Sequence, residues 1–330
     1  MRRTVLFGTL AALSASAASA DTLIVGNKAE HTASFIDLAS GREIARRETG
    51  RAPHEIAVSP DGRTAVLVSY REQGYEGNTL HVFDVETATK TGEISLGAHK
   101  GPHGLKWIPG TDRVVATTEI TRDVVVVDIA EKQVVGAIAS EQDGTHMVAL
   151  SPDATRAYAA SIGSGSFTVF DLARMTKIRD VKAGEGTEAI AVSPDGAVIW
   201  VGNNGSKSVM AFDAESFEKV VEFKTDGIPI RVELSPDGSS IAVSEPDLAQ
   251  ATIYDAATKT VRARIDLAAA DASVPVTMLF SPDGAKLWIA ATGSAKVVEV
   301  ETQGWTIVRT LPAGRGSDGL AYSPRNVRAD

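Results

Sequence analysis

The sequence contains no cysteine, and this absence removes several classes of functional site at once. Disulfide scaffolds, thiol nucleophiles, iron–sulfur clusters, cysteine-ligated zinc and covalently attached c-type haem all require a thiol. Aromatic residues are also scarce, at 5% of the 330 positions. The four tryptophans stand in or beside predicted strands, where we expect packing rather than an aromatic binding platform.

Several sequence motifs of known chemistry are missing as well. The chain has no P-loop, no His-Glu-x-x-His zinc motif, no EF-hand loop and no Gly-x-Ser-x-Gly nucleophile elbow. The nearest glycine pattern, Gly163-Ser164-Gly165-Ser166, falls in a predicted hairpin loop and opens no helix. The sequence therefore predicts neither a nucleotide cofactor nor haem c.

The first twenty residues have the features of a secretory signal peptide. Met1-Arg2-Arg3 supplies a positive start, an apolar run follows, and Ala18-Ser19-Ala20 offers a cleavage site. The apolar run is shorter than the roughly 20 residues that a spanning helix needs. We therefore expect residues 1–20 to be removed and residues 21–330 to be exported to the periplasm, without a membrane span. A buried N-terminal helix is the alternative.

The rest of the chain repeats itself. Ser59-Pro60-Asp61-Gly62 returns in intact and weaker copies, whose seven prolines are spaced by 42 to 49 residues, at positions 60, 109, 152, 194, 236, 282 and 324. Acidic residues that follow β-branched or aromatic runs recur in step with them, as Asp37, Asp84, Asp128, Asp171, Asp213, Asp255 and Glu299. A period near 42 is typical of a propeller blade with four short strands. Equal spacing favours turn-building over catalysis for these carboxylates.

The two ends of the chain complete one another. The segment 319–322 supplies an inner strand without followers, whereas residues 23–45 supply three strands without an inner partner. We therefore predict an all-β fold: a single seven-bladed propeller of four-stranded antiparallel blades, whose last blade combines three N-terminal strands with one C-terminal strand. An open β solenoid, the alternative, would need capping sequences, and none is visible.

The pattern carries a family resemblance. Ala191-Val192-Ser193-Pro194-Asp195-Gly196 followed by Trp200-Val201-Gly202-Asn203 resembles the YVTN-repeat propellers, which include binding proteins and lactonase-like relatives. The resemblance spans essentially all of 21–330. Most blades replace the last asparagine of the tetrad; Asn27 and Asn203 keep it, and we predict both as ligand-binding residues.

One face of the disc is the predicted functional face, because it carries the loops of variable length, such as 70–79 and 268–273. Each inner strand begins on this face, and its entry position lies five residues before the serine of the Ser-Pro turn or its equivalent. Around the ring these positions are His54, His103, His146, Glu188, Ile230, Val276 and Asp318. Neighbouring imidazoles at equivalent positions of adjacent blades are expected to reach a common point. Glu119 should point to the same mouth.

These residues leave two interpretations open. Neutral imidazoles suit a divalent transition metal, so His54, His103 and His146 are a candidate metal site, with Glu188 and Asp318 as flanking ligands. A hydrated polar rim is the simpler alternative, because polar channel mouths are common in propellers. Lys106 and Glu233 stand where other blades mostly carry alanine and are expected to enter the channel.

Two functions follow from these interpretations. The first is a periplasmic binding protein, a monomer that presents the mouth to a small molecule or another protein, with His54, His103, Glu188 and Asp318 as ligand-binding residues. The second is a lactone hydrolase or lyase with Glu119 or His146 as general base. Pro102-His103-Gly104 with Thr118-Glu119 looks similar to elements of streptogramin lyases. The net charge of −9 disfavours nucleic acid as a partner.

Overall fold

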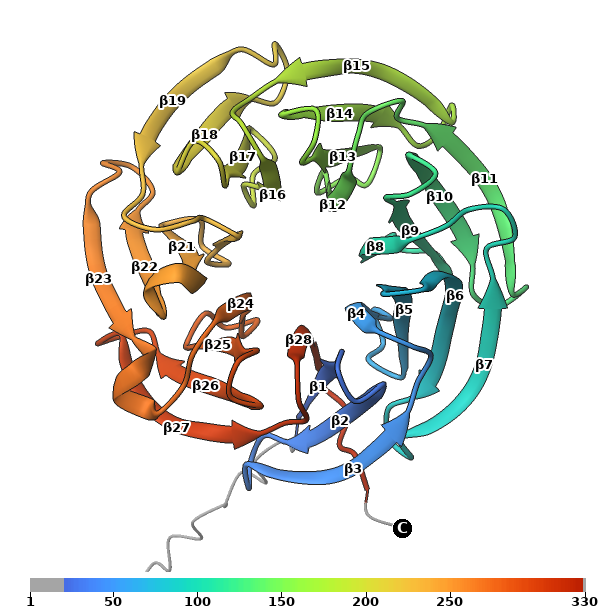
Figure 1. The fold of residues 1–330 in the computed structure, drawn as a ribbon, viewed down its shortest axis with the longest axis vertical. Helices are drawn as coiled ribbons and strands as arrows, with labels where there is room; N and C mark the ends of the chain where they lie inside the picture. Colours follow the sequence, from blue (N-terminus) through green and yellow to red (C-terminus); the bar gives the residue numbers. More distant parts are fainter. Residues whose placement is uncertain (1–20, 329–330) are drawn as a thin grey trace, which may run out of the picture.

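The chain folds as a ring of seven β-sheets, described here for residues 21–328 of a computed structural model (Figure 1). Within this range, 28 strands form seven four-stranded antiparallel sheets, and two short 3-10 helices lie in loops. The predicted all-β, seven-bladed fold is confirmed. No helix within residues 21–328 has the length and apolar character that a membrane crossing requires. The predicted signal peptide at 1–20 lies outside the described residues.

The blades follow one another along the chain, and we number them from the first complete one. Blade 1 holds β4 (Pro53–Val58), β5 (Thr64–Glu72), β6 (Tyr75–Asp84) and β7 (Thr89–Ser95). Blade 2 holds β8 (Pro102–Trp107), β9 (Arg113–Thr118), β10 (Asp123–Asp128) and β11 (Gln133–Ala139). Blade 3 holds β12 (Thr145–Leu150), β13 (Arg156–Ser161), β14 (Ser166–Asp171) and β15 (Thr176–Lys182).

The remaining blades have the same order. Blade 4 holds β16 (Thr187–Val192), β17 (Val198–Asn203), β18 (Ser208–Asp213) and β19 (Lys219–Lys224). Blade 5 holds β20 (Arg231–Leu234), β21 (Ser240–Glu245), η1 (Pro246–Leu248), β22 (Gln250–Asp255) and β23 (Val261–Asp266). Blade 6 follows η2 (Leu267–Ala270) and holds β24 (Pro275–Phe280), β25 (Lys286–Ala291), β26 (Lys296–Glu301) and β27 (Thr306–Pro312). Blade 7 holds β28 (Ser317–Ser323), β1 (Thr22–Asn27), β2 (Thr32–Asp37) and β3 (Arg42–Glu48).

The repeated tetrads and acidic residues build turns, as predicted. Asp61 Oδ1 accepts hydrogen bonds from the Ser59 hydroxyl, at 2.6 Å, and from the backbone N–H of Arg63, at 3.0 Å. Asp84 in β6 accepts the backbone N–H of Thr87 at 3.0 Å in the turn that follows the third strand. Short polar side chains that hold backbone N–H groups in this way fix the turn geometry.

The seventh of these acidic markers was predicted at the wrong position. Glu301, at the end of β26, pairs with Lys286 in the register that Asp37 and its equivalents have with the second strand. Glu299 lies two residues earlier and is buried, where its carboxylate accepts hydrogen bonds from Trp288 and Arg309. Both residues are glutamates in one strand and face the same side of it, so sequence spacing alone did not separate them.

Closure of the ring follows the prediction. β28 pairs antiparallel with β1, for example Leu320 with Val25, and the two ends of the chain thereby form one sheet (Figure 1). β28 also lies against β4 of blade 1, so closely that a Cβ on Gly319 would overlap the carbonyl oxygen of His54. Beyond β28, Arg325 donates to the backbone carbonyl of Asp61 at 2.8 Å and ties the segment to blade 1.

A β-bulge lies at the start of six of the seven inner strands. In β4 the pairing with β5 moves from Pro53 to Ile56 while the partner moves only from Ser69 to Leu67. The same single-residue insertion occurs in β8, β12, β16, β24 and β28. A bulge re-aims side chains, because two residues of one strand oppose one residue of its partner. The bulges lie at the predicted site residues.

One predicted loop is instead a hairpin. Residues 70–79 of blade 1 were expected to be irregular, but β5 and β6 continue through them, pairing Arg71 with Glu76 and Glu72 with Tyr75. The two-residue connection ends in Gly74, whose positive φ of 74° suits a tight hairpin turn. This extended hairpin stands above the mouth of the channel.

We predict that Gly319→Ala destabilises the ring, since the added methyl group cannot fit against the His54 carbonyl. Overpacking at a rigid contact costs about 1–3 kcal/mol of unfolding free energy. Gly304→Ala is the matched control, because an added Cβ there has no neighbour closer than 3.7 Å. Urea denaturation of both variants measures the difference. Equal stability of the two variants would contradict the close packing of β28 on β4.

Candidate functional site

The structure brings the predicted ring of polar residues together at one end of the channel. His54, His103, His146, Glu188 and Asp318 each occupy the second position of their inner strand, directly at the bulge. All five residues are buried. Because the inner strands surround the axis, residues far apart in sequence come into contact there (Figure 1).

The three imidazoles pack in a row, in which His146 stacks on His103 and His54 is tilted by 55° to His103. The rings of His103 and His146 lie 3.5 Å apart between centroids and nearly parallel, and His54 follows at 4.1 Å from His103. His103 Nε2 and His54 Nε2 are 3.1 Å apart, within hydrogen-bond distance. Tyr70 from the extended hairpin packs edge-on against His103 at 4.7 Å. Stacked rings place their nitrogens in successive layers.

His146 is held between two carboxylates. Its Nδ1 lies 2.6 Å from Glu119 Oε2, and its Nε2 lies 3.3 Å from Glu188 Oε1. Burial opposes a charge on this ring, but the hydrogen bonds to the two carboxylates outweigh it and raise the pKa of His146. Burial likewise opposes the charges of Glu119 and Glu188, but their bonds to His146 lower the pKa of both.

The pKa shifts of His146, Glu119 and Glu188 define the pH range in which this triad stabilises the fold. The carboxylate contribution is present above the usual glutamate pKa of about 4.3 and is lost as pH falls through the lowered folded values. The contribution of His146 is present below the usual histidine pKa of about 6.5 and is lost as pH rises through its raised folded value. The triad is therefore most stabilising in mildly acidic to neutral solution.

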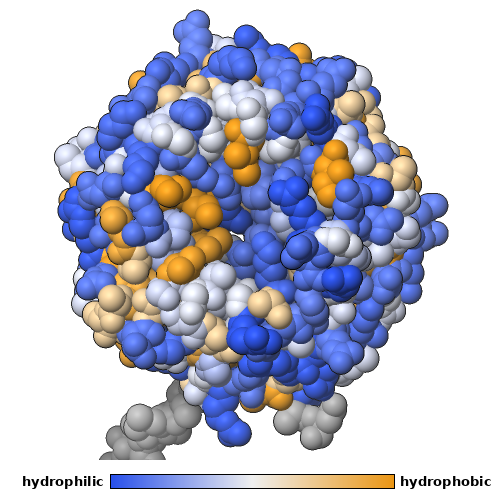
Figure 2. Space-filling model, in the orientation of Figure 1, coloured by the Kyte–Doolittle hydropathy of each residue, from blue (hydrophilic) through white to orange (hydrophobic). Residues whose placement is uncertain are grey.

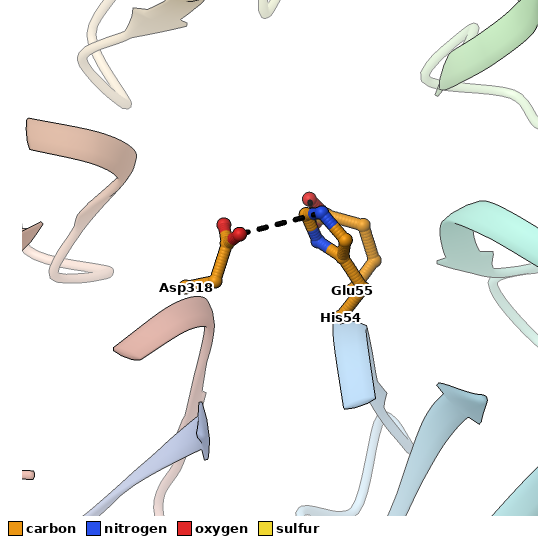
Figure 3. Close-up of side chains that lie close together, drawn as sticks. All are labelled: His54, Glu55 and Asp318. Atoms are coloured by element: carbon orange, nitrogen blue, oxygen red, sulfur yellow. Dashed lines mark ion pairs between the residues drawn. The ribbon is translucent and has the colours of Figure 1, made fainter. Parts of the chain in front are cut away.

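His54 has the opposite environment. Burial and the nearby cations Lys28 and Arg231 lower the pKa of His54 well below its usual value, so its imidazole is neutral. Its Nε2 lies 3.3 Å from Asp318 Oδ2, across the junction of blades 1 and 7 (Figure 3). Its Nδ1 has no hydrogen-bond partner among the described residues. A proton on Nε2 serves both Asp318 and His103, and leaves the Nδ1 lone pair free.

Arg231 is the central cation of the site. It is buried, and its guanidinium reaches Glu55 Oε1 of blade 1 at 3.0 Å and Glu188 Oε1 of blade 4 at 3.3 Å. It therefore connects blade 5 with two other blades across the channel. Sequence reasoning missed Arg231 and Glu55, which stand one position after the predicted ring; the signal that could have found them is the charge at this position, where other blades carry small or apolar residues.

A second ring of residues lies above the first. Its members come directly after equivalent positions of the second strands, which are Asn27, Ser69, Thr118 and Asn203. Four of them belong to the site: Lys28, Tyr70, Glu119 and Asn204. Tyr70 donates a hydrogen bond to Glu119 Oε2 at 2.5 Å, and Asn204 donates to Glu188. Only Glu119 was predicted. A comparison of the position of Glu119 with the equivalent positions of the other blades would have identified Lys28, Tyr70 and Asn204.

These side chains border a cavity of about 600 Å³ that opens at the mouth. His54 and His146 line it together with Tyr70, Arg231 and Asp318. Cavities of this size bury a small organic ligand. The site is thus an open cup with a buried acid–base cluster along one wall.

Asn27 and Asn203 do not belong to this cup, and their prediction as ligand-binding residues is not supported. Both are fully buried. The Asn27 amide donates to Ser34 and accepts the backbone N–H of Gly314, and the Asn203 amide accepts the backbone N–H of Gly184 and the hydroxyl of Thr187. Their amides therefore hold loops within and between blades.

Lys106 and Glu233 occupy equivalent positions deeper along the inner strands, opposite Val115 and Ala242. Burial raises the pKa of Glu233 to about 7, while the charge of Lys106 opposes this rise. The two groups interact electrostatically, in keeping with the expectation that both enter the channel.

The predicted metal site has a different geometry from the one expected. Within residues 21–328, the compact group of possible metal ligands is His54, Glu55 and Asp318, whose ligand atoms lie within 4.8 Å of one another (Figure 3). His103 and His146 stack instead of converging on this point. Arg231 already contacts Glu55 and supplies a positive charge there. The residues of this cluster therefore favour the Arg231 guanidinium, rather than a metal ion, as their cation.

We predict that Arg231→Met strongly destabilises the fold, because it leaves Glu55 and Glu188 buried without their cation. Breaking a buried pair in this way costs about 3–5 kcal/mol. The control is Arg264→Met, since Arg264 forms a half-exposed pair with Asp226, worth about 0–1 kcal/mol. Chemical denaturation at several pH values measures both variants. A deficit no larger than that of Arg264→Met would contradict the assignment.

Comparison with known proteins supports the fold and identifies the family. Residues 130–304, more than half of the chain, match the family model described as "Lactonase, 7-bladed beta-propeller". A solved structure of Kuenenia stuttgartiensis hydrazine synthase is similar, with a TM-score of 0.76 and 19% identity, covering 85% of this chain and 92% of that chain. At this identity the likeness shows the fold alone. No curated protein matches by sequence.

The seven four-stranded blades and the match over more than half of the chain lead to one conclusion: this protein belongs to the lactonase family of seven-bladed β-propellers.

Proposed function

We propose that this chain is an enzyme that opens a cyclic ester by acid–base catalysis at the channel mouth, the second of the two functions that the sequence left open. One observation carries the proposal: His54 and His146 line the same cavity, and their surroundings move their pKa values in opposite directions. A neutral and a charged imidazole in one site provide a base and an electrostatic stabiliser. Membership of the lactonase family supports a lactone as the substrate.

His54 is the proposed general base. Asp318 lies next to its Nε2 and favours the tautomer that keeps the Nδ1 lone pair free. The Nδ1 atom is buried, so the proposed step requires a water molecule to reach it from the cavity. Nδ1 then takes a proton from this water while the water oxygen forms a bond to the ester carbonyl carbon. Positioned proton transfer of this kind typically contributes about 10²–10⁴-fold to a rate.

His146 and Arg231 are the proposed stabilisers of the oxyanion. Arg231 is positively charged, and the raised pKa of His146 favours its charged form. Both are buried and line the cavity, where charges act more strongly than in water. When the tetrahedral intermediate collapses, the bond between the carbonyl carbon and the ring oxygen breaks. The ring oxygen then takes the proton from His54, and the product is a hydroxy acid. Water is the only co-reactant, and His54 ends the cycle neutral.

Tyr70 and Arg71 are proposed positioning residues. They reach the two oxygens of Glu119, at 2.5 Å and 2.8 Å, and thereby fix the carboxylate that bonds to His146. Export to the periplasm remains a proposal that rests on residues 1–20 of the sequence.

We predict that His54→Gln lowers kcat/KM for lactone hydrolysis by about 10²–10⁴-fold while the fold is retained, because glutamine cannot accept the proton. His99→Gln is the control, since His99 pairs with Asp123 outside the cavity. Proton release from a lactone panel in a pH-stat measures turnover. Activity that survives in His54→Gln would contradict the assignment of the base.

Two other results would replace the proposal. Binding of lactones without turnover would favour the binding-protein function. Turnover that is lost with a chelator and restored by a divalent transition metal would favour a metal-dependent mechanism, whereas we expect the chelator to have no effect.

We also predict a bell-shaped dependence of kcat/KM on pH. The rate should fall on the acid side only as pH drops through the lowered pKa of His54, and on the alkaline side as pH rises through the raised pKa of His146. Glu119→Gln removes one carboxylate from His146, lowers its pKa and moves the alkaline limb to lower pH. The control Glu76→Gln, in the exposed part of the hairpin, should leave it in place. An alkaline limb that Glu119→Gln does not move would rule out His146 as its origin.

A further inference from the structure

The mouth of the channel is divided into a polar arc and an apolar arc. The polar ring residues belong to blades 7, 1, 2, 3 and 4, whereas blades 5 and 6 place Ile230 and Val276 at the equivalent positions. Both line the same cavity as His54 and His146. Figure 2 shows apolar surface beside the central hollow, on the side where Figure 1 places β21, η1 and β24.

Two exposed apolar residues extend this arc outward. Leu248, in η1 of blade 5, is 45% exposed, and Val274, directly before β24 of blade 6, is 40% exposed. Asp247 of η1 accepts the backbone N–H of Ile228, which fixes η1 against the segment that leads to Ile230. Leu248 and Val274 thus lie in segments next to those that carry Ile230 and Val276 in the cavity wall.

The backbone at Val274 is strained. Its φ is +55°, a conformation that a β-branched residue rarely adopts. The equivalent position, two before the ring residue, is Gly101, Gly144, Gly186 and Gly316 in blades 2, 3, 4 and 7, all with positive φ, and Ala52 in blade 1. Glycine, which four other blades carry at this position, would avoid the unfavourable backbone, so fold stability alone does not account for the valine. Strain of this kind is concentrated at functional sites.

We propose that the apolar arc, formed by Ile230, Leu248, Val274 and Val276, binds a hydrocarbon arm of the substrate. The proposal rests on the proposed function and names its substrate class: a lactone ring with an alkyl or acyl substituent. The ring faces the histidines and the arm crosses the axis to blades 5 and 6. Burial of each methylene group in the arc favours binding by up to about 0.8 kcal/mol, so affinity should rise by about two- to fourfold per methylene.

The experiment compares γ-butyrolactone with its butyl- and hexyl-substituted analogues, and includes glucono-δ-lactone as a polar probe. Hydrolysis is followed by proton release, and binding is measured separately by calorimetry with the corresponding alkyl-substituted lactams, which resist hydrolysis. We expect kcat/KM and affinity to increase with the length of the alkyl arm. Affinity that does not depend on the arm would overturn the inference and leave the proposed function standing. Affinity that increases without hydrolysis would overturn the proposed function and leave the apolar arc standing.

Val274→Gly tests the strained position. It introduces the residue that four other blades carry, so we expect unchanged or higher thermal stability together with a loss of at least half of the chain-length dependence. Leu248→Ser should weaken the dependence as well. Val220→Ser is the control, because Val220 is 58% exposed on the outer strand β19, away from the mouth. Lower stability with intact chain-length dependence in Val274→Gly would show a structural role and contradict the inference.

Discussion

The pairing of β28 with β1 is the interaction on which the rest of the structure depends. It joins the two ends of the chain in one blade, and it places β28 against β4 with almost no space between their backbones. Asp318 thereby comes within 3.3 Å of His54, and the ring closes around a channel. An open array of the same blades would have separated these two residues and would have provided no common mouth.

Closure also explains the electrostatics of the site. Arg231 reaches carboxylates of two other blades, and the packed histidines come from three consecutive blades. Burying these charges is expensive unless each has a partner. The pairing is uneven: hydrogen bonds to two carboxylates raise the pKa of His146, whereas burial, Lys28 and Arg231 lower that of His54 although Asp318 and Glu55 lie near it. This asymmetry favours the charged form of one imidazole and the neutral form of its neighbour, which a binding rim alone would not require.

Much of the fold and part of the site could be predicted from the sequence. The repeated prolines gave the number of blades, and equivalent positions gave the five polar ring residues, because a propeller maps sequence repeats directly onto a circle. Glu55 was missed, since the bulge in β4 that turns the residue after His54 toward the axis has no sequence signal of its own. Arg231 begins β20, which has no bulge, and only its charge distinguishes it from its equivalents. Tyr70 was missed because residues 70–76 are mostly polar and contain glycine. Such a sequence does not predict that β5 and β6 pair through this segment.

The central claim is that one site holds a neutral His54 beside a charged His146. Nitrogen-15 NMR of the imidazole side chains, with His54→Gln and His146→Gln for assignment, measures this directly. Near pH 7, where histidines ordinarily titrate, the account predicts a doubly protonated His146 and a His54 that carries a single proton, on Nε2. A neutral His146, or a charged His54, under the same conditions would contradict it.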